Sequence, residues 1–153
     1  MNKGLVAVAT AGSVGLLGGA FLFQFAGYPP CQMCFWQRYP HAIAIFIGVV
    51  ALALGARALA WLGALAAATT AAIGVYHTGV ERDWWDGPAS CTGGGGLTGD
   101  LLSTEGPRLV MCDQVSWALF GLSMASWNAV FSAVLVVIWI SAALSKEGSS
   151  RTA

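Results

Sequence analysis

Four long apolar stretches restrict the fold of this chain more than any other feature of its sequence. The first runs over 4–27 without an acidic or basic residue, and further stretches follow at about 35–56, 59–77 and 126–144. A helix needs about 20 apolar residues to cross the hydrocarbon core of a bilayer. The sequence therefore predicts an all-α membrane protein, a bundle of four transmembrane helices.

The composition supports this prediction. Of the 153 residues, 57% are hydrophobic and 9% are charged, whereas soluble domains carry roughly 25% charged residues. The formal net charge is zero, so no nucleic-acid-binding function is supported. The length suits a single integral membrane domain, 1–153. The first stretch is too long for the apolar core of a signal peptide, so we expect it to remain as a span.

The basic residues indicate how the spans are oriented. Four of them lie beside span ends on one side: Lys3, Arg57, Lys146 and Arg151. Because short cytoplasmic segments are enriched in Lys and Arg, we expect both termini in the cytoplasm and the protein in a bacterial inner membrane. The loops 28–34 and 78–125, of which the second is mainly acidic, then face the periplasm. That compartment is kept oxidising.

Prolines and glycines shape the first two spans. Pro29 and Pro30 end the first helix, since proline lacks the N–H that a helix interior needs. A second helix that began only at Pro40 would be barely long enough to span. We therefore expect it to begin near Cys34, with a kink at Pro40.

A small-residue face on the first span consists of Gly12, Gly15, Gly18 and Gly19. Such a face lets helices approach closely, so we expect it to pack within the bundle; self-dimerisation is the alternative.

The first outer loop carries the segment Cys31-Gln-Met-Cys34-Phe-Trp-Gln-Arg38. On a helix, Arg38 lies one turn beyond Cys34 and on the same face. A nearby cation and a helix N-terminus both favour a thiolate over a thiol. The segment therefore predicts a redox dithiol with one activated sulfur. The alternatives at this point are half of a zinc site and two inert core thiols.

The other two cysteines, Cys91 and Cys112, both lie in the second outer loop. Cys91 has no second cysteine close by, so the paired spacing of a zinc ribbon is missing. A disulfide interpretation pairs Cys91 with Cys112, either as a static staple or as a bond that exchanges with the first dithiol. The run Gly93–Gly96 directly after Cys91-Thr92 gives Cys91 freedom to move, which favours exchange.

If the Cys91–Cys112 disulfide exchanges with the first dithiol, the electrons that the cysteines receive need a final acceptor. The sequence has no haem motif, no dinucleotide fingerprint and no iron–sulfur spacing, so we expect a membrane quinone, either ubiquinone or menaquinone. Arg38 could stabilise a thiolate or a developing oxyanion. His77, at the outer end of the third span, could donate a hydrogen bond or proton; the alternative is an ordinary interfacial histidine. We expect His41 to be structural or interfacial.

Four motifs together resemble the bacterial DsbB family of disulfide bond formation proteins, over nearly the full length. They are the Cys31–Arg38 segment, Tyr76-His77-Thr78-Gly79-Val80-Glu81, the pair Cys91 and Cys112, and Phe120-Gly-Leu-Ser-Met-Ala-Ser-Trp127. The resemblance implies a membrane thiol oxidase that reoxidises a periplasmic, thioredoxin-like DsbA partner and reduces a quinone.

The resemblance also implies a role for each position. Cys91 would accept attack by the partner, and Cys112 would resolve that intermediate and pass the electrons to Cys31. Cys34 would interact with the quinone, supported by Arg38. His77 falls at or near a position linked to the quinone site. The short, Gly-rich stretch between Cys91 and Cys112 departs from the family pattern and affects partner contacts.

Two alternatives to this function remain at the level of sequence. A vitamin K epoxide reductase-like protein also combines four helices with C-x-x-C, but places the motif late, on a terminal helix. A membrane protein with a cysteine-coordinated metal is the other alternative. It would need both outer loops to converge in one tetrahedral site, and four reduced thiolates in an oxidising compartment. We therefore expect no metal.

Overall fold

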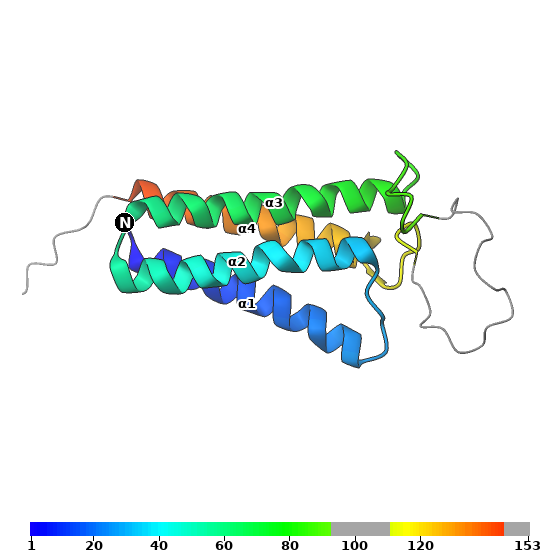
Figure 1. The fold of residues 1–153 in the computed structure, drawn as a ribbon, viewed down its shortest axis with the longest axis horizontal. Coiled ribbons are helices and arrows are strands. Elements are labelled where there is room, and N and C mark those ends of the chain that lie inside the picture. The colour runs from blue at the N-terminus through cyan, green and yellow to red at the C-terminus, as the bar shows by residue number, and fades with distance from the viewer. Residues whose placement is uncertain (93–110, 146–153) are drawn as a thin grey trace, which may run out of the picture.

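The computed structural model describes residues 1–92 and 111–145 of the chain. The expected mobility of Gly93–Gly96 and the expected contribution of Lys146 and Arg151 to orientation lie outside the described residues. Four long helices make up the described part: α1 (Lys3–Phe25), α2 (Gln32–Leu54), α3 (Arg57–Glu81) and α4 (Met124–Leu144). All four are long and apolar enough to cross a membrane. The predicted all-α bundle of four spans is confirmed (Figure 1).

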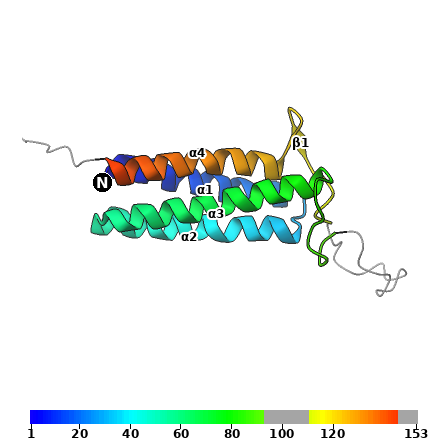
Figure 2. The same cartoon turned by 90° about the horizontal axis from the view of Figure 1, so that it is seen from above.

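The helices pack in a ring in which each packs mainly against two neighbours. α3 lies between α2 and α4, and α1 contacts α2 and α4 on the other side (Figure 2). The half of the bundle that holds the N-terminus is filled with small side chains around one indole. Its buried cluster includes Val6, Ala9, Ala51, Ala60, Ala64, Ala67, Leu135 and Trp139. Small residues bring membrane helices close together, so this half is tightly packed.

In the other half, α1 leans away from its neighbours (Figure 1). A Cβ added to Gly12 would lie 2.5 Å from Leu135, so this glycine does pack within the bundle. A Cβ added to Gly15, Gly18 or Gly19 would meet no described atom within 4 Å. The expectation that the whole glycine face packs within the bundle is therefore wrong for these three residues, because α1 diverges there.

α2 begins at Gln32 and continues through Pro40 to Leu54, so the prediction that this helix starts before the proline is confirmed. Cys31 is its N-cap residue: its backbone is extended, with φ −79° and ψ 174°. The helix ends at Gly55, whose φ of 70° is the left-handed conformation that closes many helices. This start places the C-x-x-C motif on the first turn of α2.

The second outer connection has regular structure at both ends. α3 continues one turn beyond His77, as far as Glu81. Just before α4, a small antiparallel hairpin pairs β1 (Ala118–Leu119) with β2 (Leu122–Ser123). Its two-residue turn has positive φ at Phe120 and Gly121, 53° and 76°, as a type I′ turn requires. The hairpin leads directly into α4 and covers the outer end of the bundle.

Candidate redox site

All four cysteines lie together at the end of the bundle opposite the N-terminus. Cys31, Cys91 and Cys112 form one buried cluster with Met33 and Val80, and Cys34 packs against it. Cys91 and Cys112 are joined in a disulfide, while Cys31 and Cys34 are free thiols. The fold therefore brings a disulfide and a dithiol from two separate loops into contact. This is the arrangement that thiol–disulfide exchange needs.

Cys31 lies at the helix N-cap, directly after two prolines. Pro30 disfavours helical backbone at Pro29, and the extended backbone of Cys31 makes Cys31 the N-cap, so α2 starts at Gln32. The Cys31 sulfur accepts the backbone N–H of Cys34 at 3.3 Å and lies 2.8 Å from the Cys34 sulfur. The hydrogen bond from the Cys34 thiol and contacts with His77 outweigh burial and lower the pKa of Cys31 to about 4. In the reduced pair, the stabilising contacts therefore converge on Cys31.

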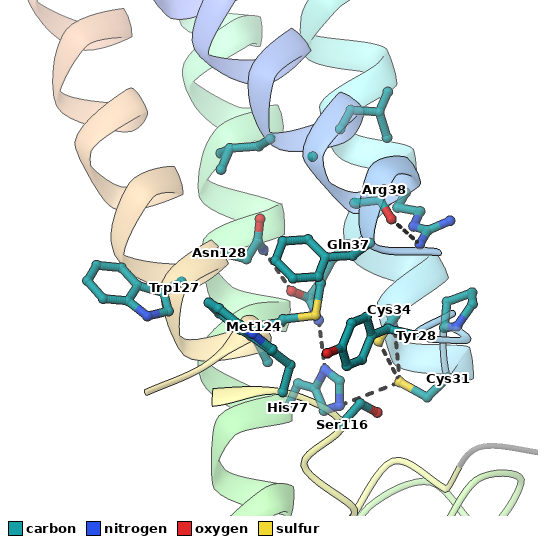
Figure 3. Close-up of a pocket in the computed structure, with 18 of the residues that line it drawn as sticks. Tyr28, Cys31, Cys34, Gln37, Arg38, His77, Ser116, Met124, Trp127 and Asn128 are labelled. Atoms are coloured by element: carbon teal, nitrogen blue, oxygen red, sulfur yellow. Dashed lines mark hydrogen bonds between the residues drawn. The ribbon is translucent and has the colours of Figure 1, made fainter. Parts of the chain in front are cut away.

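His77 lies against this sulfur. The ring is buried, with 2% of its surface exposed, and its Nε2 atom is 3.6 Å from the Cys31 sulfur (Figure 3). The same atom is 3.8 Å from the Glu81 carboxylate, which in turn accepts a short hydrogen bond from Ser123. On the other side of the ring, Nδ1 is 2.8 Å from the Gln37 amide nitrogen. The structure thus places His77 beside the reactive sulfur.

Arg38 is held by α1. Its Nη1 atom donates to Gln24 Oε1 at 2.6 Å, and Nη2 donates to the Ala20 carbonyl at 3.2 Å. The guanidinium also lies 4.9 Å from the ring centre of Phe21 and 5.1 Å from that of Phe35, within the range of cation–π attraction. Its hydrogen bonds to described residues therefore link α2 to α1 and do not reach the sulfur of Cys34.

A cavity of about 380 Å³ opens beside Cys34, where α1 leans away (Figure 3). Cys34, Arg38 and His77 line its outer part. Its apolar wall includes Gly15, Leu16, Gly19, Phe23, Trp117, Met124, Trp127 and Phe131. Gln37, His41 and Asn128 supply further polar groups. A mostly apolar cavity with a few convergent polar groups is typical of small-molecule sites in proteins.

The geometry also bears on the metal-binding alternative. Because Cys91 and Cys112 are joined to each other, the four-cysteine zinc site is not formed. The ligand atoms of Cys31, Cys34 and His77 do lie within 4.8 Å of one another. Structural zinc sites almost always have four protein ligands, and these three groups alone do not complete one.

Several site residues escaped the sequence analysis: Gln24, Gln37, Thr70 and Asn128. Gln37 follows Cys34 by three residues and so shares its helix face. Asn128 is an amide within an apolar span, and polar groups inside spans are often functional. These two could have been found from the sequence. Gln24 and Thr70 gain their importance only from contacts with other helices.

Comparison with known proteins identifies the family of this chain. The model of the family described as "Disulfide bond formation protein DsbB" matches residues 2–142. A disulfide bond formation protein B of Xanthomonas oryzae pv. oryzae is 33% identical over 152 residues, covering 89% of this chain and 87% of the relative. One of Albidiferax ferrireducens is 26% identical, covering 88% and 83%. No solved structure matches the chain. With its four spans and its adjoining cysteine pairs, the chain belongs to the DsbB family of disulfide bond formation proteins.

Proposed function

We propose that this thiol oxidase reoxidises a periplasmic DsbA-like dithiol protein and passes the electrons to a membrane quinone, and that it thereby supports disulfide bond formation. One observation carries the proposal: the Cys91–Cys112 disulfide, the Cys31/Cys34 dithiol and a mostly apolar cavity adjoin one another. A relay between a protein partner and a lipid-soluble acceptor needs these three parts side by side. Because the relay depends on parts of the bundle and of both loops, we propose that the whole chain, 1–153, functions as one membrane domain.

The relay consists of four successive thiol–disulfide exchanges, each of which breaks one S–S bond and forms one. A partner thiolate attacks Cys91, which forms a mixed disulfide and releases Cys112 as a thiolate. Cys112 then attacks Cys31 of a Cys31–Cys34 disulfide and releases Cys34. The partner's second thiolate attacks the mixed disulfide, which releases the oxidised partner and the Cys91 thiolate. Cys91 then attacks Cys112, which re-forms their disulfide and releases Cys31, so that the electron pair resides on the Cys31/Cys34 dithiol.

The cavity suits a quinone as the final acceptor. When bound, a quinone takes up two electrons and two protons, so the partner's dithiol becomes a disulfide as the quinone becomes a quinol. Cys34 borders the cavity and supplies the electron pair as its disulfide with Cys31 re-forms. Arg38 can balance negative charge at the cavity's outer part, and His77 can donate a hydrogen bond or proton there. Both ubiquinone and menaquinone fit this chemistry.

The distribution of charge supports the proposed orientation. Lys3 and Arg57 begin α1 and α3 at the end of the bundle opposite the cysteines. By the positive-inside rule that end is cytoplasmic. The termini are then cytoplasmic and both cysteine-bearing loops are periplasmic, in a multi-pass protein of the bacterial inner membrane.

The deciding experiment mixes the purified protein with a reduced DsbA-like protein and either ubiquinone or menaquinone. We expect one quinone reduced for each partner dithiol oxidised. Cys34→Ser should oxidise at most about one equivalent of partner from its loop disulfide and then stall, because its quinone-side thiol is missing. Sustained quinone reduction by Cys34→Ser would contradict the proposed role of Cys34.

Metal analysis of the same sample tests the remaining alternative. One equivalent of zinc, together with no dithiol oxidation by either quinone, would favour the cysteine-coordinated metal-binding function. The vitamin K epoxide reductase-like alternative has less support, because the motif lies on α2 and not on a terminal helix, and because the family is that of DsbB.

A further inference from the structure

A chain of hydrogen-bonded polar side chains runs from the Cys31 sulfur into the interior of the bundle. It passes from His77 Nδ1 to Gln37 Nε2 (2.8 Å), from Gln37 Oε1 to Asn128 Nδ2 (2.7 Å), and from Asn128 Oδ1 to His41 Nε2 (2.9 Å). His41 and Gln37 are buried, with 2% and 6% of their surfaces exposed. The chain joins α2, α3 and α4, and the redox steps proposed above do not use its inner members.

Thr70 fixes the direction of this chain. Its hydroxyl has a single hydrogen, which it donates to the backbone carbonyl of Gln37 at 3.1 Å. Thr70 Oγ1 can therefore only accept from Asn128, at 3.1 Å. The Asn128 group that faces Thr70 must then be the NH₂ group, because an amide oxygen cannot donate. Ser132 agrees with this orientation, since its hydroxyl donates to Asn128 Oδ1 at 3.5 Å.

Once the orientation of the Asn128 amide is known, the donor and the acceptor of each following hydrogen bond are determined. Asn128 Nδ2 donates to Gln37 Oε1, so the Gln37 NH₂ group faces His77 and donates to Nδ1. A ring nitrogen that accepts a hydrogen bond carries no proton. The proton of a neutral ring is then on Nε2, the atom nearest the Cys31 sulfur and the Glu81 carboxylate. Both of these neighbours can accept a hydrogen bond from Nε2. The contacts of Nδ1 and those of Nε2 therefore indicate the same tautomer.

We propose that Thr70, Asn128 and Gln37 are positioning residues that keep Nδ1 of His77 free of a proton, so that the ring presents its single N–H to the Cys31 sulfur. Amide side chains do not readily give up their protons, so the chain orients His77 and does not conduct protons. The functional meaning rests on the proposed exchange at Cys31, because an N–H donated to the sulfur favours the thiolate, the form that takes part in exchange.

This role differs from simple packing in a way that nitrogen NMR can detect. The chain has only two histidines, so ¹⁵N-histidine labelling of the full-length reduced protein in detergent gives two rings to assign. A His77→Asn variant identifies the signals of His41. Protonated and unprotonated ring nitrogens have well-separated ¹⁵N shifts, which report directly on Nδ1 of His77.

In the wild type we expect Nδ1 of His77 unprotonated and Nε2 protonated. Gln37→Met keeps the length of the side chain but removes the donor, so the Nδ1 signal should shift toward its protonated position. Thr70→Val keeps the shape but removes the group that orients Asn128, and should give a shift in the same direction. Thr69→Val is the matched control, because the hydroxyl of Thr69 bonds only within its own helix, to the Leu65 carbonyl.

A protonated Nδ1 in the wild type would overturn the proposal. So would an unchanged Nδ1 signal in Gln37→Met, or an equal shift in Thr69→Val and Thr70→Val. If Gln37→Met does not fold, the wild type and the two threonine variants decide. Because the ring is observed without partner or quinone, this result is independent of whether the proposed oxidase activity is found.

Discussion

Three neighbouring groups act on the sulfur of Cys31. The extended backbone of Cys31 makes it the N-cap of α2, where its sulfur accepts the backbone N–H of Cys34. The Cys34 thiol and the His77 ring complete the surroundings of the sulfur. Together they lower the pKa of Cys31 from an ordinary value of 9.0 to about 4. A group with a lowered pKa keeps its charge until the pH falls to that lower value.

The first prediction concerns the alkylation of reduced Cys31 by iodoacetamide as a function of pH. Only the thiolate reacts, so the rate at Cys31 should change little between pH 8 and pH 6 and fall as the pH approaches 4. An ordinary thiol would lose about tenfold in rate for each pH unit over that range. Mass-spectrometric fragmentation separates Cys31 from Cys34.

Two variants test the cause of this profile. Cys34→Ala removes the largest stabilising contact and should raise the midpoint most, and His77→Ala should raise it less. A wild-type profile with its midpoint near 9 would show that Cys31 is an ordinary thiol.

The second prediction concerns Arg38, whose charge borders the cavity. We expect Arg38→Ala to raise the quinone KM about tenfold or more, because a hydrogen bond to a charged group contributes about 1.5–3 kcal/mol. Arg38→Lys should recover part of the loss, since lysine keeps the charge but not the planar fork. Steady-state quinone reduction at saturating partner measures both.

Gln24→Ala separates two explanations of any effect at Arg38. This variant removes the hydrogen bond that links Arg38 to α1 but leaves the charge at the cavity. A nearly normal KM in Gln24→Ala would mean that Arg38 acts through its charge. A KM as high as that of Arg38→Ala would mean that Arg38 acts by holding α1, and an unchanged KM in Arg38→Ala itself would rule out both roles.

At the scale of helices, the divergence of α1 creates the cavity. Gly12 is in tight contact with Leu135, whereas the next glycines along the helix face open space. Gly15 and Gly19 line the cavity, and Gly18 is not among its lining residues. The same helix thus packs closely at one end and lines the cavity at the other, where Gly15 and Gly19 leave space in its wall.

The third prediction uses this difference. Gly15→Leu should fill part of the cavity and raise the quinone KM several-fold, while the single-turnover oxidation of the partner by the loop disulfide stays unchanged. Gly18→Leu is the matched control and should leave both values unchanged, because its added side chain also meets open space but outside the cavity. Equal effects of the two variants would show that the wall of α1 does not limit quinone access.

The fourth prediction concerns the second outer loop. A partner that carries only its nucleophilic cysteine should be trapped covalently by Cys112→Ser, since Cys91 is then free and the mixed disulfide has no resolving thiol. Cys91→Ser should trap less, because Cys112 has 0% of its surface exposed and Cys91 has 5%, and because Cys112 lies against His77. A non-reducing gel under mild oxidation compares the two adducts. Equal adducts would contradict Cys91 as the preferred entry cysteine, and more adduct from Cys91→Ser would identify Cys112 as the entry cysteine.

At the scale of the whole molecule, function depends on which side of the membrane each end of the bundle faces. Our fifth prediction is that a thiol reagent that cannot cross membranes labels reduced Cys31, Cys34, Cys91 or Cys112 only from the periplasmic side. Intact spheroplasts and inside-out vesicles give the two orientations, with a cysteine introduced at Ala56, between α2 and α3, as the control for cytoplasmic exposure. Labelling of the native cysteines only in inside-out vesicles would reverse the orientation.

The sequence by itself determined the four helices and the start of α2 before Pro40, although it placed Cys31 and Cys34 in the loop 28–34, whereas α2 begins at Gln32. These features depend on local properties: the length of apolar stretches, the missing N–H of proline and the spacing of residues along a helix. It also predicted the pairing of Cys91 with Cys112, because both lie in the same loop, 78–125.

Only the tertiary structure decided how these parts meet. The contact between the two cysteine pairs, the partners of Arg38 and the chain from His77 to His41 each join residues on different helices or loops. Such contacts depend on how each helix is rotated and tilted against its neighbours, and a single sequence does not encode this locally. The same reason explains why the glycine face of α1 lines a cavity beyond Gly12, where packing was expected.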